Sequence, residues 1–128
     1  MPSETGTMPE QATGPIVAAI SREIVGLYAR LLGQGPARAR TRIDEDHVVC
    51  VLEDVFTRAE RLLIDAGRGE QVVEMRRCLQ EEIAPQLVQL VEEQTGRTVR
   101  VCLGQVDADA DLALEFSSLE PSSAAPGA

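Results

Sequence analysis

The sequence contains few aromatic residues, no Trp and no Lys. Among its 128 residues are one Tyr and two Phe, and all 12 basic residues are Arg. Stacking on bases or sugars needs aromatic side chains, and a net charge of −9 opposes attraction to nucleic acid or anionic lipid. We therefore do not expect a nucleic-acid partner.

Long apolar runs and cysteine motifs are also absent. The longest apolar runs have about five residues, as in 48–52, whereas a membrane-spanning helix needs about 20. The three Cys residues, Cys50, Cys78 and Cys102, lack the CxxC spacing of a zinc site. With no secretory leader, we expect a cytoplasmic protein with reduced thiols, which contacts a membrane only through a partner and does not insert into it.

What the sequence does contain is typical of one α+β domain. Hydrophobic residues make up 44% of the chain, an ordinary share for a globular protein. Residues 1–13 and 120–128 are rich in small and polar residues without apolar periodicity. We therefore expect disordered tails around a single domain at 14–119.

Hydrophobic periodicity predicts the order α-β-β-α-α-β-β. A short acidic turn separates the two strands of each pair, which indicates two β-hairpins in one antiparallel sheet packed against helices. Pro85 falls inside the third helix and is expected to kink or break it. The predicted helices are 14–32, 57–66 and 70–94, and the predicted strands are 37–43, 47–55, 98–106 and 112–119.

Two of these helices carry apolar stripes at spacings of three and four residues, which should face the core. Thr57 and Glu60 have the spacing of a capping box at the start of the short helix. The stripes are Ile16, Ile20, Ile24, Leu27 and Leu31 in the first helix, and Val72, Met75, Leu79, Ile83, Leu87 and Leu90 or Val91 in the third.

The first predicted strand alternates Arg with smaller residues. Arg38, Arg40 and Arg42 share one of its faces, and guanidinium groups side by side repel each other unless something neutralises them. Internal carboxylates such as Glu53, Glu115 or those of the acidic turns are one explanation. The other is a surface for an anionic ligand or a partner, which makes this row a candidate site.

The second strand is apolar on both faces. Val48, Cys50 and Leu52 point one way, and Val49 and Val51 point the other way. A chain this short covers one sheet face with its own helices, and exposed apolar surface marks interfaces. We predict a homodimer with Val49 and Val51 in its interface.

One acidic run has the spacing that opens a calcium-binding loop. Asp107, Asp109 and Asp111 fit that opening, but the loop requires Gly at its sixth position and Glu at its twelfth. Leu112 and Ser118 stand there instead. We therefore expect no metal site and interpret the run as a hairpin turn.

Nucleophilic catalysis has no support in the sequence either. His47 is the only His, and a separation of three from Cys50 places the two on opposite faces of a strand. They cannot form a nucleophile–base pair, so we expect Cys50 in the core and His47 exposed at a strand end. Gly-rich phosphate loops are also absent. We expect no catalytic residue, no cofactor and no enzymatic activity.

Several short motifs follow one another in a distinctive order, namely Gly35–Pro36, Ala39–Arg40–Thr41, Val48–Val49–Cys50, Leu52–Glu53–Asp54, Thr57 with Glu60, Glu92–Glu93, Thr95–Gly96–Arg97, and an Asp-x-Asp turn before Leu112–Ala113. Their combination resembles the small bacterial MpsC family, named after a proposed sodium-translocating, membrane-potential-generating system. The resemblance covers roughly residues 15–119. It implies an accessory protein associated with membrane proteins that handle sodium, bicarbonate or membrane potential, and it carries over no site residues.

Two functions follow from these observations. The first is a non-enzymatic accessory or interaction protein resembling MpsC, linked to a membrane ion- or bicarbonate-handling system through a membrane protein partner. The alternative is a small anion- or nucleotide-binding regulatory protein that uses the Arg38, Arg40 and Arg42 face. Charge reversal of Arg40 distinguishes the two, because only the second function requires that guanidinium for ligand binding.

Overall fold

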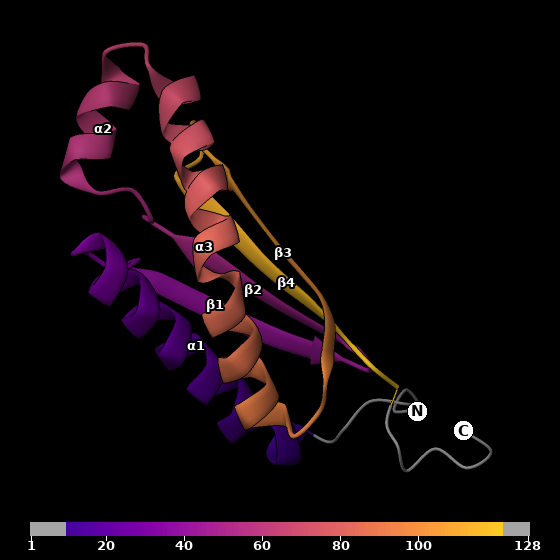
Figure 1. Ribbon diagram of the computed structural model, residues 1–128. Helices are drawn as coiled ribbons and strands as arrows, with labels where there is room; N and C mark the ends of the chain where they lie inside the picture. Colours follow the sequence, from indigo (N-terminus) through magenta and orange to yellow (C-terminus); the bar gives the residue numbers. More distant parts are fainter. Residues whose placement is uncertain (1–9, 122–128) are drawn as a thin grey trace.

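The structure, a computed structural model, describes residues 10–121, with side chains from residue 14 onward. This part of the chain folds in the order α-β-β-α-α-β-β, which confirms the predicted α+β class. Figure 1 shows the elements, which are α1 (Glu10–Leu32), β1 (Arg38–Asp44), β2 (His47–Glu53), α2 (Arg58–Asp65), α3 (Gly69–Thr95), β3 (Val99–Asp107) and β4 (Leu112–Leu119).

The strands of the described residues form one antiparallel sheet in the order β1-β2-β4-β3. Both predicted hairpins are present, and β2 of the first pairs with β4 of the second. The register aligns Thr41, Cys50, Glu115 and Gly104 in one row across the middle of the sheet. Each long helix contacts the edge strand of the hairpin that follows it, so the two halves of the fold repeat one α-β-β arrangement.

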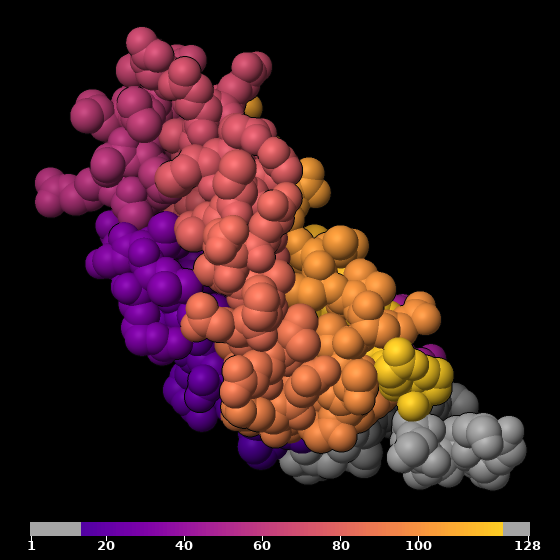
Figure 2. All heavy atoms as spheres, viewed as in Figure 1, coloured from indigo at the N-terminus to yellow at the C-terminus, as the bar shows by residue number. Residues whose placement is uncertain are grey.

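The two long helices lie on the same side of the sheet (Figure 1). In the space-filling view from that side, α1 and α3 cover much of the sheet, and β3 emerges along the outer edge of α3 (Figure 2). The core lies between this helix layer and the strand residues that point toward it. Its buried apolar side chains are Ile20, Ile24, Leu27, Tyr28, Val48, Cys50, Leu52, Val55, Phe56, Val72, Ile83, Leu87, Leu90, Val91, Ala113 and Leu119.

The apolar stripe of α1 ends differently from the prediction. Ile20, Ile24 and Leu27 are buried as expected, but Leu31 is 45% exposed and Tyr28 is buried instead. An α-helix has 3.6 residues per turn, so Tyr28 continues the line of Ile24 toward the sheet. The aromatic ring thereby brings a hydroxyl group into the core.

The stripe of α3 needs a similar correction. Met75 is 45% exposed, whereas Arg76 is 5% exposed and faces the core. Position 76 lies one helical turn after the buried Val72, so the helix geometry directs it inward. An apolar pattern by itself assigns an Arg to solvent, and only the tertiary structure supplies the buried partner that this side chain needs.

Pro85 does not break α3, which runs through it from Gly69 to Thr95, so the predicted break is wrong. The Pro side chain is exposed, while Ile83 and Leu87 on either side of it are buried in the core. A Pro inside a helix removes one backbone hydrogen bond, and packing of the inner helix face holds the helix together across that gap.

The first helix begins earlier than the predicted start at residue 14. Helix α1 starts at Glu10, so residues 10–13 of the predicted N-terminal tail are helical in backbone. Two residues of the predicted C-terminal tail, 120 and 121, follow β4 and are exposed. The rest of the two predicted tails, 1–9 and 122–128, lies outside the described residues.

Candidate functional site

The side of the sheet away from the helices is open and has an apolar centre. Directly paired residues of antiparallel strands point to the same side, so the register identifies what lies there. We define the open face by Arg38, Arg40 and Arg42 of β1, Val49 and Val51 of β2, Leu114 and Phe116 of β4, and Val101, Leu103, Gln105 and Asp107 of β3. Leu103 is 59% exposed and Leu114 is 38% exposed, so apolar surface faces solvent.

The three arginines of β1 lie along one edge of the open face. Arg38 approaches Glu53 of β2 to 3.6 Å, and both side chains are largely exposed. Within the described residues, Arg40 and Arg42 have no ion pair. Glu115 is buried on the opposite face of the sheet, so it does not neutralise this row as one of the sequence explanations required.

The acidic turns have local partners of their own. In the first turn, Asp46 lies 2.5 Å from the Arg97 guanidinium. In the second, Oδ1 of Asp111 accepts hydrogen bonds from the backbone N–H groups of Val55 at 2.7 Å and Phe56 at 3.1 Å. Asp111 therefore anchors the loop that follows β2, and no ion pair within the described residues joins an acidic turn to Arg38, Arg40 or Arg42.

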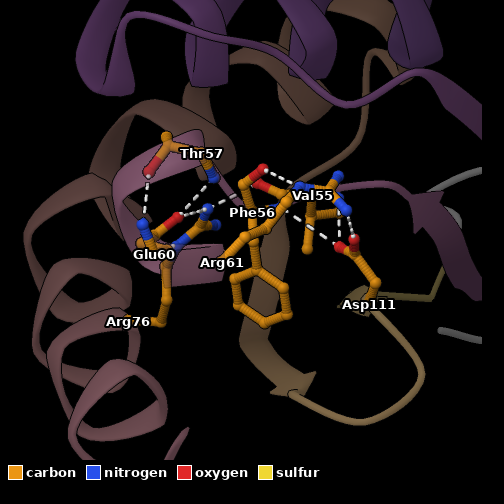
Figure 3. Close-up of polar contacts among 7 residues, drawn as sticks. All are labelled: Val55, Phe56, Thr57, Glu60, Arg61, Arg76 and Asp111. Carbon is orange, nitrogen blue, oxygen red and sulfur yellow. Dashed lines mark hydrogen bonds and ion pairs between the residues drawn. The ribbon is translucent and has the colours of Figure 1, made fainter. Parts of the chain in front are cut away.

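A buried ion pair joins α2 to α3 (Figure 3). The Arg76 guanidinium donates to both carboxylate oxygens of Glu60 at 2.7 Å, and it also donates to the carbonyl oxygen of Val55 at 2.5 Å. The side chains of Arg76 and Glu60 are only 3% and 7% exposed. The guanidinium carbon lies 5.9 Å and 5.2 Å from the ring centres of Tyr28 and Phe56, which adds cation–π attraction.

Glu60 also completes the predicted capping box of α2. The N–H of Thr57 donates to Glu60 Oε1 at 2.8 Å, and the N–H of Glu60 donates to Thr57 Oγ1 at 3.2 Å. Burial raises the pKa of Glu60, but hydrogen bonds from Arg76 and the Thr57 backbone outweigh burial and hold this pKa below its usual value. The Glu60 carboxylate is therefore ionised at neutral pH, and it links α2 to α3 through Arg76.

A second buried carboxyl, Glu115, lies at the centre of the sheet beneath the helix layer. The Tyr28 hydroxyl of α1 donates to Glu115 Oε2 at 2.6 Å, and the Gln80 amide of α3 donates to Oε1 at 2.8 Å. Glu115 is 6% exposed. Burial raises the pKa of Glu115 to about 7, although the two hydrogen bonds act in the opposite direction.

A cavity of about 100 Å³ lies beside this carboxyl, between α1, α3 and β3. Its polar lining includes Tyr28, Gln80 and Arg76, and apolar side chains of both helices make up most of the rest. Gly104 of β3 lies under Gln80, because a side chain at position 104 would come within 2.3 Å of the Gln80 amide. The cavity is large enough for a few water molecules.

The cysteines and the histidine do not form a reactive pair. As predicted, Cys50 is buried among the core residues, and His47 is exposed on the other side of the sheet, where its ring lies 5.5 Å from that of Phe116. Burial raises the pKa of the Cys50 thiol. Burial, with a smaller contribution from the charge of Glu115, raises the pKa of Cys102 to about 11. Both thiols are therefore protonated at neutral pH and are poor nucleophiles.

Sequence reasoning did not identify the hydrogen-bonded roles of Tyr28, Gln80, Arg76 and Glu115 between the helices and the sheet. One signal was present for Glu115, because it alternates in phase with the inward-facing Ala113 along β4. Arg76 likewise falls in phase with the apolar stripe of α3. Such a residue in an inward phase is a candidate for a buried, hydrogen-bonded group.

In the part of the chain that the structure describes, no group of three or more His, Cys, Asp or Glu side chains is placed to hold a metal ion. None of the helices there combines the length and the apolar character that crossing a membrane requires.

Comparison with known proteins identifies a family. The model of the family described as "Na+-translocating membrane potential-generating system (MpsC)" matches residues 12–120, which is most of the chain. Neither the curated proteins nor the solved structures that were searched contain a match. The matched region contains both hairpins, the open face and the two buried carboxyls, and the chain belongs to the MpsC family.

Proposed function

We propose that this chain is a non-enzymatic accessory protein of a membrane-potential-related system, and that it works by binding proteins through the open face. The family description supplies the link to membrane potential. The observation that carries the proposal is an apolar sheet face that the helices of the described residues leave uncovered. We further propose that the protein is cytoplasmic and reaches a membrane through a protein partner.

The first partner that we propose for the open face is a second copy of the chain. A two-fold axis parallel to the strands, between β2 and β4, places the apolar centre of one copy over that of the other. The same axis sets Arg38 over Asp107 of the second copy and Val51 over Leu114 of the second copy, because the register aligns these residues across one sheet. Opposite charges then meet at both edges of the interface.

The oligomeric state tests this pairing. Light scattering during gel filtration at micromolar concentration should give roughly twice the chain mass of 13.8 kDa. The variant Leu114→Asp should give the monomer mass of a folded chain, since it places a carboxylate over Val51 of the second copy in the apolar centre, at a side chain that is 38% exposed. Val49→Asp should dissociate the dimer as well.

A matched control is available on the other side of the molecule. Leu62 of α2 is 71% exposed and is not part of the open face, so Leu62→Asp should leave the dimer mass unchanged. A wild-type mass near that of one chain, or a dimer that persists in folded Leu114→Asp, contradicts the proposed interface.

The alternative function is anion or nucleotide binding by the Arg row. It is favoured by one observation, which is that the exposed Arg40 and Arg42 have no ion pair within the described residues. Isothermal titration calorimetry with ATP and with inorganic pyrophosphate tests it. Binding that is lost in Arg40→Glu and retained in Arg58→Glu, which makes the same charge change on α2, supports this alternative. No heat of binding in the wild type contradicts it.

A further inference from the structure

Glu115 lies where the two halves of the fold meet. It belongs to the central strand β4, directly opposite Cys50 of β2 and beside Gly104 of β3. Its two hydrogen-bond partners come from different helices, Tyr28 from α1 and Gln80 from α3. A change at this carboxyl therefore acts on both helices and on the sheet at the same time.

The partners of Glu115 accommodate either protonation state. A hydroxyl group both donates and accepts, and a Gln amide presents a donor or, after rotation by 180°, an acceptor. An ionised Glu115 accepts from Tyr28 and Gln80 as observed, whereas a protonated Glu115 donates its own O–H to the rotated amide of Gln80. In either state both oxygens of the Glu115 carboxyl keep a hydrogen-bond partner.

No basic side chain holds Glu115 in its ionised form. The titratable groups around it are Tyr28 of α1, Arg76 and Arg77 of α3, Cys50 of β2 and Cys102 of β3. Of the two cations, Arg76 donates two hydrogen bonds to Glu60, and Arg77 forms ion pairs with Glu74 and Glu81. Burial without a charge partner favours the neutral acid.

The cavity supplies a route for the proton. Tyr28, Gln80 and Gly104 line it, and the Gln80 amide is the group that stands over Gly104 and caps the carboxyl. Rotation of this one flexible side chain opens a path between the cavity and Glu115. The absence of a side chain at position 104 leaves the room that the amide occupies.

We propose that Glu115, Tyr28 and Gln80 form a proton-sensitive switch, in which protonation of Glu115 sets how tightly α1 and α3 pack on the sheet. The switch stands on the contacts within one copy of the chain, so it does not depend on the proposed dimer. Its chemistry is a reversible proton transfer between water in the cavity and the carboxylate.

The sign of the effect follows from the pKa of Glu115. Burial raises this pKa from the ordinary value of 4.5 to about 7 in the folded chain, so the folded state holds the proton more tightly than the unfolded state does. The resulting stabilisation is complete below pH 4.5 and is lost as the pH rises through 7. The folded state is therefore less stable above pH 7, where Glu115 is ionised.

The fluorescence of Tyr28 reports the protonation state of Glu115 directly. Tyr28 is the single Tyr of the chain, and the chain has no Trp, so ultraviolet emission reports the environment of this one side chain. A carboxylate that accepts a hydrogen bond from the phenol quenches Tyr emission. Emission should therefore fall between pH 5.5 and 8.5 in the full chain, and the transition should be absent from Glu115→Gln.

Stability measured in urea gives a second test. Between pH 5.5 and 8.5, the folding equilibrium constant of the wild type should fall roughly 30-fold more than that of Glu115→Gln, as expected for pKa values of 4.5 and about 7. Equal pH dependence in the two proteins overturns the switch. Other titrating groups cancel in this comparison, because the two chains differ only at position 115.

Two further variants keep the proposal testable if Glu115→Gln does not fold. The carboxyl signal of Glu115 in carbon-13 NMR should titrate with a midpoint near pH 7. Tyr28→Phe and Gly104→Ala should each move that midpoint upward, the first by deleting one hydrogen bond and the second by pushing the Gln80 amide off the carboxyl. A wild-type midpoint below pH 5 overturns the proposal.

Discussion

Glu60 and Glu115 are both buried carboxyl groups, yet their surroundings give them opposite properties. Every group that contacts the Glu60 carboxylate is a donor that cannot accept a hydrogen bond, namely the guanidinium of Arg76 and the backbone N–H of Thr57. Glu115 instead contacts a hydroxyl and an amide, which can reverse their roles. Burial raises the pKa of both groups, but only at Glu60 do hydrogen bonds outweigh it.

The type of hydrogen-bond partner, more than burial itself, decides whether a core carboxyl stays ionised or can adopt either charge state. The Glu60 region joins the loop after β2 to α2 and α3, and a neutral carboxyl there would leave Arg76 buried without a counter-charge. The Glu115 region joins α1, α3 and the sheet through neutral groups, and it tolerates either charge state. Four predictions test this contrast.

The largest effect is expected from removing the cation of the Glu60 region. Arg76→Met leaves the Glu60 carboxylate buried and unpaired, which should destabilise the domain by about 3–5 kcal/mol in urea denaturation. Adding Glu60→Leu to this variant should recover much of the loss, because no lone charge then remains in the core. Arg77→Met is the matched control, since the ion pairs of Arg77 lie in solvent, and its midpoint should stay that of the wild type.

Asp111 supports the same region from the second hairpin. Asp111→Ala removes the acceptor for the N–H groups of Val55 and Phe56 and the ion pair with Arg61, and it should cost about 2 kcal/mol of unfolding free energy. Asp111→Asn keeps an oxygen acceptor and suits the left-handed backbone at this position, where φ is 53°. An Asn variant as unstable as the Ala variant would show that charge, and not the two hydrogen bonds, carries the effect.

The N-cap of α2 makes a smaller contribution. Thr57→Ala removes the hydroxyl that accepts the N–H of Glu60 and should lower the unfolding free energy by about 1 kcal/mol. Thr57→Ser retains this oxygen and should recover most of the loss. An unchanged urea midpoint in the Ala variant would mean that Arg76 alone holds Glu60 in place.

The smallest effect is expected from protonation of Glu60, which lowers stability only in acid. Its pKa is lowered in the folded chain, so it contributes stability above its ordinary pKa and loses that contribution as the pH falls through the folded value. Between pH 6 and pH 3, the wild type should therefore lose more stability than Glu60→Gln. This sign is opposite to that expected for Glu115 between pH 5.5 and 8.5, and equal signs would remove the contrast between the two groups.

Several features of the two strands and of α2 are predictable from local pattern. Alternation along 38–43 groups Arg38, Arg40 and Arg42, and alternation along 48–52 separates Val49 and Val51 from Cys50. The structure confirms both groupings. The spacing of Thr57 and Glu60 indicates a capping box that the structure contains. These features depend on interactions between residues a few positions apart, which a single segment of sequence displays.

Local sequence pattern is enough to predict the element order, the two hairpins, the side-chain alternation of β1 and β2 and the start of α2, because hydrophobic periodicity and turn chemistry act over short separations. The hydrogen bonds of Glu115 to Tyr28, 87 positions away, and to Gln80, 35 positions away, depend on the tertiary structure. The burial of Arg76 against Glu60 depends on it as well. The physical reason is that a buried polar group is acceptable only with a partner, and strand order β1-β2-β4-β3 with both long helices on one side brings those partners together.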